Sequence, residues 1–241
     1  MGSHASLRST VIITVSAGFV IVAAGGVALA HGASRGPAYP AKAVVIFAIV
    51  AALASTFVRS SHPFPTFGAA NAVTTARAAL VALVAAFIGE GAAPAQAAAI
   101  VTLATAVTVL DGVDGWIARR TGMGSDFGAR FDMETDALLI LALSILTCQY
   151  GKAGAWVVLS GLLRYLFVAA GWVWAWMKRP LPPRFRRKMV CVVQIVALLI
   201  ALLPAVVPPA SRVIAAASLA LLAWSFGVDT AWLAGYTDES R

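Results

Sequence analysis

The chain has 241 residues, of which 61% are hydrophobic and only 12% are charged, and its formal net charge is +8. This composition excludes an ordinary soluble domain, and a single secretory signal does not explain it because apolar segments recur to the C-terminal end. The basic residues lie at the ends of apolar runs rather than on a soluble face, which argues against nucleic acid as a partner.

Eight apolar runs follow one another along the chain. A helix needs about 20 apolar residues to span a bilayer. We place the runs near residues 9–30, 42–58, 72–89, 96–118, 133–150, 153–176, 189–207 and 211–234. Short polar or Pro/Gly-rich stretches separate them and leave no room for a soluble domain. The pattern predicts an all-α, polytopic integral membrane protein with about eight transmembrane helices.

The distribution of basic residues predicts the orientation of these helices. If the N-terminus is cytoplasmic, most of the 18 Lys and Arg residues fall on the cytoplasmic side. Positive residues favour that side of a membrane. We therefore expect both termini to face the cytoplasm, in an inner or plasma membrane.

Four of the ten acidic residues, Asp111, Asp114, Asp132 and Asp136, follow one another at helical spacing; Asp126 and Glu134 lie in the same stretch but outside this pattern. At 100° per residue, Asp111 and Asp114 share one side of a helix, and Asp132 and Asp136 form a stripe on the next one. Carboxylates are costly in a membrane, so such a cluster indicates a functional site on the cytoplasmic side. Oxygen ligands suit Mg²⁺ or Mn²⁺. The same helix faces also carry Gly115, Ala118, Arg119 and Gly128.

The run from Asp111 to Asp136 resembles the signature Asp-x2-Asp-Gly-x2-Ala-Arg-x8-Gly-x3-Asp-x3-Asp of the CDP-alcohol phosphotransferases at every fixed position. The run Asn71-x2-Thr74-x2-Arg77 resembles the start of the first core helix in many members. The resemblance extends more loosely over residues 70–235. It divides the chain into two extra N-terminal helices, residues 1–68, and a six-helix catalytic core, residues 69–241.

The resemblance implies a membrane transferase that forms homodimers. It would move a phosphatidyl group from CDP-diacylglycerol to the hydroxyl of an alcohol and release CMP. Two divalent cations, Mg²⁺ or Mn²⁺, would be held by Asp111, Asp114, Asp132 and Asp136, and Asp136 would also be the general base. The CDP-lipid would be bound by Asn71, Thr74, Gly115, Ala118, Arg119 and Gly128.

The acceptor is predicted from basic residues in the second half of the chain. The fragment Lys188-x2-Cys191-x2-Gln194 resembles Lys-x2-Thr-x2-Gln of phosphatidylglycerophosphate synthases, with Cys191 in place of Thr. These features favour glycerol 3-phosphate, and leave inositol phosphate or a serine-like alcohol open. A topology signal is the other explanation of the basic residues. The candidates to bind the acceptor are Arg130, Arg164, Arg184, Arg186, Arg187 and Lys188.

Two other classes fit a membrane chain that is rich in aspartate. Intramembrane prenyltransferases also use two Asp-rich motifs, Mg²⁺ and a pyrophosphate, although their motifs usually lie far apart in the sequence. An ion-coupled transporter would place carboxylates along an ion path at mid-membrane depth. Here the motifs lie on adjacent helices and at their cytoplasmic ends, which favours the phosphotransferase.

Overall fold

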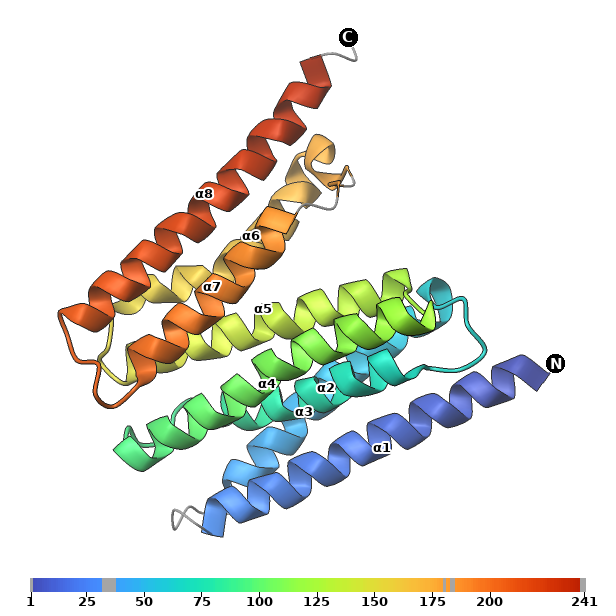
Figure 1. Cartoon of the computed structure of the whole chain (residues 1–241), viewed down its shortest axis with the longest axis horizontal. Coiled ribbons are helices and arrows are strands. Elements are labelled where there is room, and N and C mark those ends of the chain that lie inside the picture. Colours follow the sequence, from blue (N-terminus) through green and yellow to red (C-terminus); the bar gives the residue numbers. More distant parts are fainter. Residues whose placement is uncertain (1, 32–37, 180, 183–184, 239–241) are drawn as a thin grey trace. The chain divides into compact units, whose positions relative to one another are not determined.

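The computed structural model describes residues 2–31, 38–179, 181–182 and 185–238, and this part of the chain is helical without a strand. Two short 3₁₀ turns, Ala155–Val158 and Ala175–Lys178, flank the sixth helix. The all-α prediction is confirmed. The α-helices are α1 Gly2–His31, α2 Ala38–Ser61, α3 Ala69–Ala85, α4 Pro94–Thr121, α5 Asp126–Gln149, α6 Leu159–Val173, α7 Phe185–Leu202 and α8 Ala210–Asp238 (Figure 1).

Five of the described helical segments are long and apolar enough to cross a membrane. They lie in α1, α2, α4, α8 and the segment formed by α6 with the 3₁₀ turn before it. Helix α3 is apolar but has only 17 residues. Helices α5 and α7 carry charged side chains in their first turns, which shortens their apolar part. An integral membrane protein with about eight helices is therefore confirmed.

Several helix boundaries differ from the prediction by four residues or more, those of α3, α5 and α6 among them. Helix α5 begins at Asp126 rather than near residue 133, because the Ser125 hydroxyl accepts a hydrogen bond from the Gly128 amide at 3.0 Å and caps the helix. The run expected near 153–176 is interrupted: α6 itself extends only from Leu159 to Val173. The first core helix, α3, ends at Ala85, four residues before the predicted end near 89.

The chain forms two compact units, residues 1–139 and 140–241. The first unit contains α1 to α4 and the first half of α5, and the second contains the rest of the chain. The sequence predicts a different boundary, at residue 68, between two extra N-terminal helices and a family catalytic core. The compact units do not test that boundary, so it stays a prediction.

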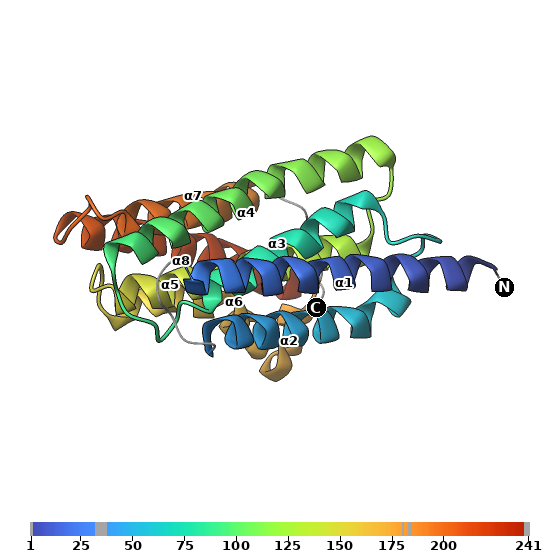
Figure 2. The ribbon, with the colours of Figure 1, turned by 90° about the horizontal axis from the view of Figure 1, so that it is seen from below.

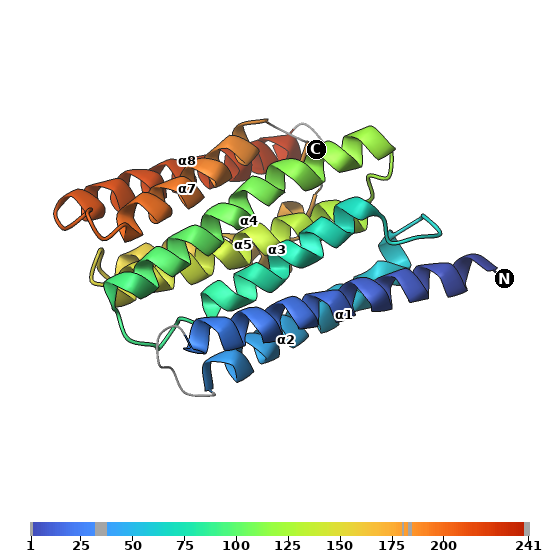
Figure 3. The same cartoon turned by 60° about the horizontal axis from the view of Figure 1, so that its bottom comes forward.

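Helix α3 is the centre of the first unit. It lies between α4 on one side and α1 on the other, with α2 behind α1 (Figures 2 and 3). Its second half is almost entirely buried, including Val81 and Leu83. The N-terminal helices are attached to its end by Tyr39, whose hydroxyl donates to the Leu83 carbonyl at 2.9 Å. Lys42 adds an ion pair of 2.7 Å with Glu90.

A buried histidine connects the N-terminal helices to the start of α5. His62 follows α2 and lies 2.8 Å from the Thr66 carbonyl through Nε2 and 3.2 Å from the Ser125 hydroxyl through Nδ1. The same hydroxyl caps α5 at Gly128. The His62 ring also packs edge-on against Phe127, at a centroid distance of 5.9 Å. The segment after α2 therefore fixes the position of the first turn of α5.

The second unit is built on the antiparallel pair α7 and α8. The turn between these helices is held by Lys152, whose ammonium donates to the carbonyls of Leu203 at 3.0 Å and Val206 at 2.6 Å. Ser211, at the start of α8, donates to the Lys152 carbonyl at 2.6 Å. The Lys152 ammonium thus adds a second donor to the Leu203 carbonyl, which also accepts from the Val206 amide at 3.0 Å, and ties the turn to the segment after α5.

Candidate active site

The four aspartates of the signature meet within the first unit. Asp111 and Asp114 come from α4 and are buried, whereas Asp132 and Asp136 come from α5 and are partly open, with side chains 35% and 20% exposed. One carboxylate oxygen from each of Asp111, Asp114 and Asp132 lies within 4.8 Å of the other two. The two helices thus bring together the carboxylates that helical spacing predicted.

An arginine from α3 lies at the centre of these carboxylates. Arg77 is fully buried, and its Nη2 is 3.0 Å from Asp111 Oδ1 while its Nη1 is 2.6 Å from Asp114 Oδ2. The same guanidinium also donates to Asp132 and Asp136. One cation therefore holds α3, α4 and α5 together at the site, and a buried charge needs such partners.

The sequence placed Arg77 in a motif but did not predict this role. A usable signal was present: Arg77 lies three residues after Thr74 and six after Asn71, so the three side chains share one face of an apolar helix. An arginine in such a helix requires anionic partners. Apart from Glu90, which follows α3, the next carboxylates along the chain are those of the signature.

The other two residues of that face also reach the site. The Thr74 hydroxyl lies 2.9 Å from Asp114 Oδ2. The Asn71 amide donates to the Phe67 carbonyl at 2.6 Å, which turns its Oδ1 toward Gly128. A Cβ added at Gly128 would lie only 2.8 Å from this oxygen. Gly128 therefore allows α3 and α5 to approach each other beside the carboxylates.

The comparison with protein families decides the class of this site. A family model described as CDP-alcohol phosphatidyltransferase matches residues 67–228. The chain belongs to the CDP-alcohol phosphatidyltransferase family. The match includes Arg77 and all four aspartates, and it supports an enzyme over the prenyltransferase and transporter alternatives. Searches of curated proteins and of solved structures found no match.

The carboxylates fit the divalent cations on which this family generally depends. Carboxylate oxygens are the donors that hard divalent ions prefer. Four carboxylates face a single guanidinium, so an excess of negative charge remains for a cation to balance. Asp111, Asp114 and Asp132 are the residues best placed to share one ion.

The remaining predicted lipid-binding residues lie along the last turns of α4. Gly115 and Ala118 are half-buried, and Arg119 is exposed. Arg130, a predicted acceptor residue, is also exposed, and its guanidinium lies over the ring of Phe57 at 4.1 Å from the centroid. The structure thus connects Arg130 to α2, and the binding roles of these residues stay predictions.

The other five predicted acceptor residues belong to the second unit, where two of them already have an acidic partner. Arg186 donates to Asp229 at 2.5 Å and to the Ser225 carbonyl at 2.8 Å. Arg187 lies 3.4 Å from Asp229. Lys188 is exposed on α7, and Arg164 is half-buried on α6. The fifth of these residues, Arg184, lies outside the described residues.

Sequence reasoning did not predict the pairing of α7 with α8 through Asp229. The acidic residue is 43 positions from Arg186 and lies in a different apolar run. A signal was present, since a lone aspartate within an apolar helix indicates a buried cationic partner. Several arginines could have been the partner of Asp229, so the sequence alone did not identify the ion pair.

Proposed function

We propose that this family member transfers a phosphatidyl group from CDP-diacylglycerol to the hydroxyl of glycerol 3-phosphate and releases CMP. The observation that supports it best is the convergence of Asp111, Asp114, Asp132 and Asp136 around Arg77, within the matched family region. Such a site suits a pyrophosphate substrate, because phosphoryl transfer depends on positioning and charge neutralisation.

The carboxylates divide into two roles in this proposal. Asp111, Asp114 and Asp132 are metal ligands, with Asp136 as a further one, for two Mg²⁺ or Mn²⁺ ions. When bound, these cations supply the positive charge that offsets the pyrophosphate. Asp136 lies on the partly open side of the cluster, where an acceptor hydroxyl can approach it. It accepts the hydroxyl proton as the new phosphate ester forms and CMP departs.

The CDP-lipid is bound by the faces of α3, α4 and α5 that border the cluster. The small side chains of Gly115, Ala118 and Gly128 leave room for the cytosine, with Asn71 and Thr74 beside them. Arg119 binds a phosphate, for which its planar guanidinium is suited. The lipid tails lie in the bilayer that the apolar helices span.

A phosphorylated acceptor requires cationic side chains, and the proposed ones are Arg130, Arg164, Arg184, Arg186, Arg187 and Lys188. Because Arg186 and Arg187 already contact Asp229, an acceptor phosphate would share these guanidiniums with that carboxylate. Inositol phosphate would use the same charges, whereas a serine-like alcohol would not need them. We further propose a homodimer with both termini and the site in the cytoplasm.

A panel of acceptors tests the proposal. Purified protein is incubated with radiolabelled CDP-diacylglycerol, Mg²⁺ or Mn²⁺, and one acceptor at a time, and the lipid products are identified by mass spectrometry. Glycerol 3-phosphate should give phosphatidylglycerophosphate and free CMP. A product formed only with serine or another uncharged or zwitterionic alcohol would overturn the acceptor assignment, and the absence of any CMP release would overturn the reaction.

A further inference from the structure

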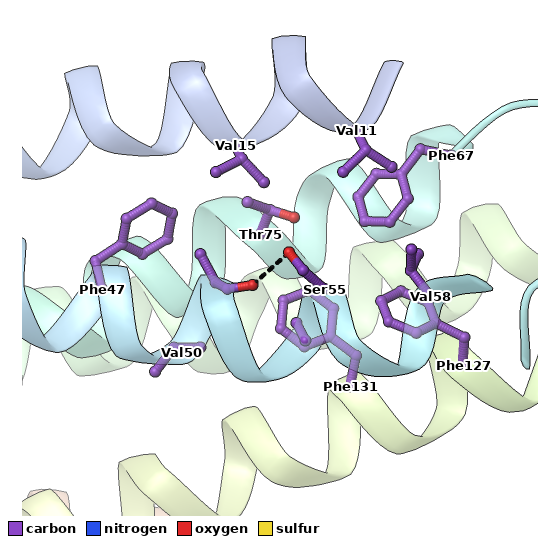
Figure 4. Close-up of a pocket in the computed structure, with 12 residues that line it drawn as sticks. Val11, Val15, Phe47, Val50, Ser55, Val58, Phe67, Thr75, Phe127 and Phe131 are labelled. Carbon is purple, nitrogen blue, oxygen red and sulfur yellow. Dashed lines mark hydrogen bonds between the residues drawn. The ribbon is translucent and has the colours of Figure 1, made fainter. Parts of the chain in front are cut away.

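An apolar groove lies beside the candidate site, between the N-terminal helix pair and the helices that carry the site. Valine and phenylalanine side chains from α1, α2 and α5 line it, together with Phe67 before α3, Thr75 of α3, and two alanines and a serine of α2 (Figure 4). It encloses about 340 Å³, including its open mouth. Along α2 its lining extends from Phe47 to Val58, which is about 16 Å of helix at 1.5 Å per residue.

The groove offers nothing to a polar ligand. Its two hydroxyl groups are already bonded within their own helices: Ser55 donates to the Ala51 carbonyl at 2.7 Å, and Thr75 donates to the Asn71 carbonyl at 2.8 Å. Neither a charged nor an amide side chain is among the lining residues. A polar occupant would lose its hydrogen bonds to water here, whereas a hydrocarbon chain would lose none.

The groove borders the candidate site along two helices, α3 and α5. On α5, Phe127 and Phe131 line the groove, and the residues that follow them are Gly128 and Asp132 of the signature. On α3, the groove residue Thr75 follows Thr74, which contacts Asp114. A ligand whose polar end lies at the carboxylates therefore has an apolar channel next to it.

The other wall of the groove comes from helices outside the matched family region. Helices α1 and α2 end before residue 67, where the match begins, and both contain segments apolar enough to span a membrane. We propose that this groove binds one hydrocarbon chain of the CDP-linked lipid whose headgroup occupies the carboxylate site. The two N-terminal helices thereby contribute to recognition of the lipid substrate. This inference rests on the proposed function.

Filling the groove tests the inference. Ala54 lines the groove, whereas Ala52 is exposed on another side of α2, so Ala54→Phe and Ala52→Phe form a matched pair. The Michaelis constant is measured for CDP-diacylglycerols with short and long acyl chains. Ala54→Phe should raise the constant for the long-chain substrate on the order of tenfold and flatten its dependence on chain length. Ala52→Phe should behave as wild type.

A second variant and a second readout cover the case in which Ala54→Phe does not fold. Ala51→Leu adds less volume to the same wall. A CDP-diacylglycerol with a mid-chain diazirine is photolysed on each protein without acceptor, and the labelled peptides are identified. Label should attach to α2 and to the Phe127–Phe131 segment, and either filling variant should reduce it while Ala52→Phe does not.

The two readouts separate the groove from the reaction. If wild type releases CMP but the filling and control variants show the same chain-length dependence and labelling, the groove assignment is wrong and the reaction stands. If the label maps to the groove without CMP release by wild type, the proposed function is wrong and the groove remains a lipid-chain site.

Discussion

Replacing Arg77 by glutamine removes the only cation described among the four carboxylates of the site. Arg77→Gln keeps a polar side chain but removes the positive charge, and the shorter amide also loses the hydrogen bonds that Nη1 and Nη2 make with the carboxylates. Breaking a buried ion pair by removing one partner typically costs about 3–5 kcal/mol, because the other charge stays buried without compensation. In a chain of this size, 1 kcal/mol shifts the melting temperature by roughly 2–4 °C, so we expect a loss on the order of 10 °C.

The metal dependence of this loss distinguishes a counter-ion from an ordinary packing residue. Thermal unfolding is measured in detergent, with EDTA and with increasing Mg²⁺ or Mn²⁺. The variant should unfold early in EDTA and regain most of the loss as the divalent ion binds, because the ion replaces the missing positive charge and ligand binding stabilises the folded state. Isothermal titration should show tighter metal binding to the variant, since Arg77 no longer repels the cation.

Arg120→Gln is a suitable control, because Arg120 is exposed at the end of α4 and its guanidinium stacks on the ring of Trp116. It should change the free energy of unfolding by no more than about 0.5 kcal/mol. A melting temperature of Arg77→Gln that is unchanged in EDTA, or that falls equally with and without metal, would refute the counter-ion role.

Three further substitutions test single parts of the site. Asp136→Asn should lower the maximal rate far more than the affinity for CDP-diacylglycerol, measured by direct binding, because a general base acts in the transition state; joint loss of both would make Asp136 mainly a metal ligand. Gly128→Ala should destabilise the protein by about 1–3 kcal/mol, because its Cβ would lie 2.8 Å from Asn71 Oδ1; the double variant with Asn71→Ala should recover part of that stability, and purely additive losses would contradict the contact. Arg186→Ala should raise the Michaelis constant of the phosphorylated acceptor on the order of tenfold or more and that of the CDP-lipid much less; normal acceptor kinetics with a lower folded yield would make Arg186 only a link between α7 and α8.

Hydropathy and helical spacing were sufficient for the architecture and for the carboxylates. Apolar runs of membrane length can form only helices when no β pattern is present, which is why the all-α fold followed from composition. The spacing of Asp111 and Asp114 puts both on one face of a helix. The spacing of Asp132 and Asp136 does the same on the next helix. Facing helices then brought the four carboxylates together without any knowledge of the loops.

The features that the sequence left open depend on local backbone contacts or on distant partners. Hydropathy locates the apolar part of α5 but not the polar first turns, which the Ser125 cap adds. It also cannot detect the end of α6 at Val173, because the residues that follow are equally apolar. The sequence did not show which acidic groups pair with Arg77, and the groove beside the site arises only when α1 and α2 pack on α3.

The most direct test of the central claim is metal-dependent release of CMP from CDP-diacylglycerol by the purified protein. Wild type should release CMP with Mg²⁺ or Mn²⁺ and lose this activity in EDTA. Asp111→Asn, Asp114→Asn and Asp132→Asn should each fall below about a tenth of the wild-type rate at saturating metal, because each removes an anionic ligand. Asp126→Asn, which changes an exposed carboxylate of α5 outside the signature, should retain activity. Near-normal release by any of the three signature variants would contradict catalysis at this cluster.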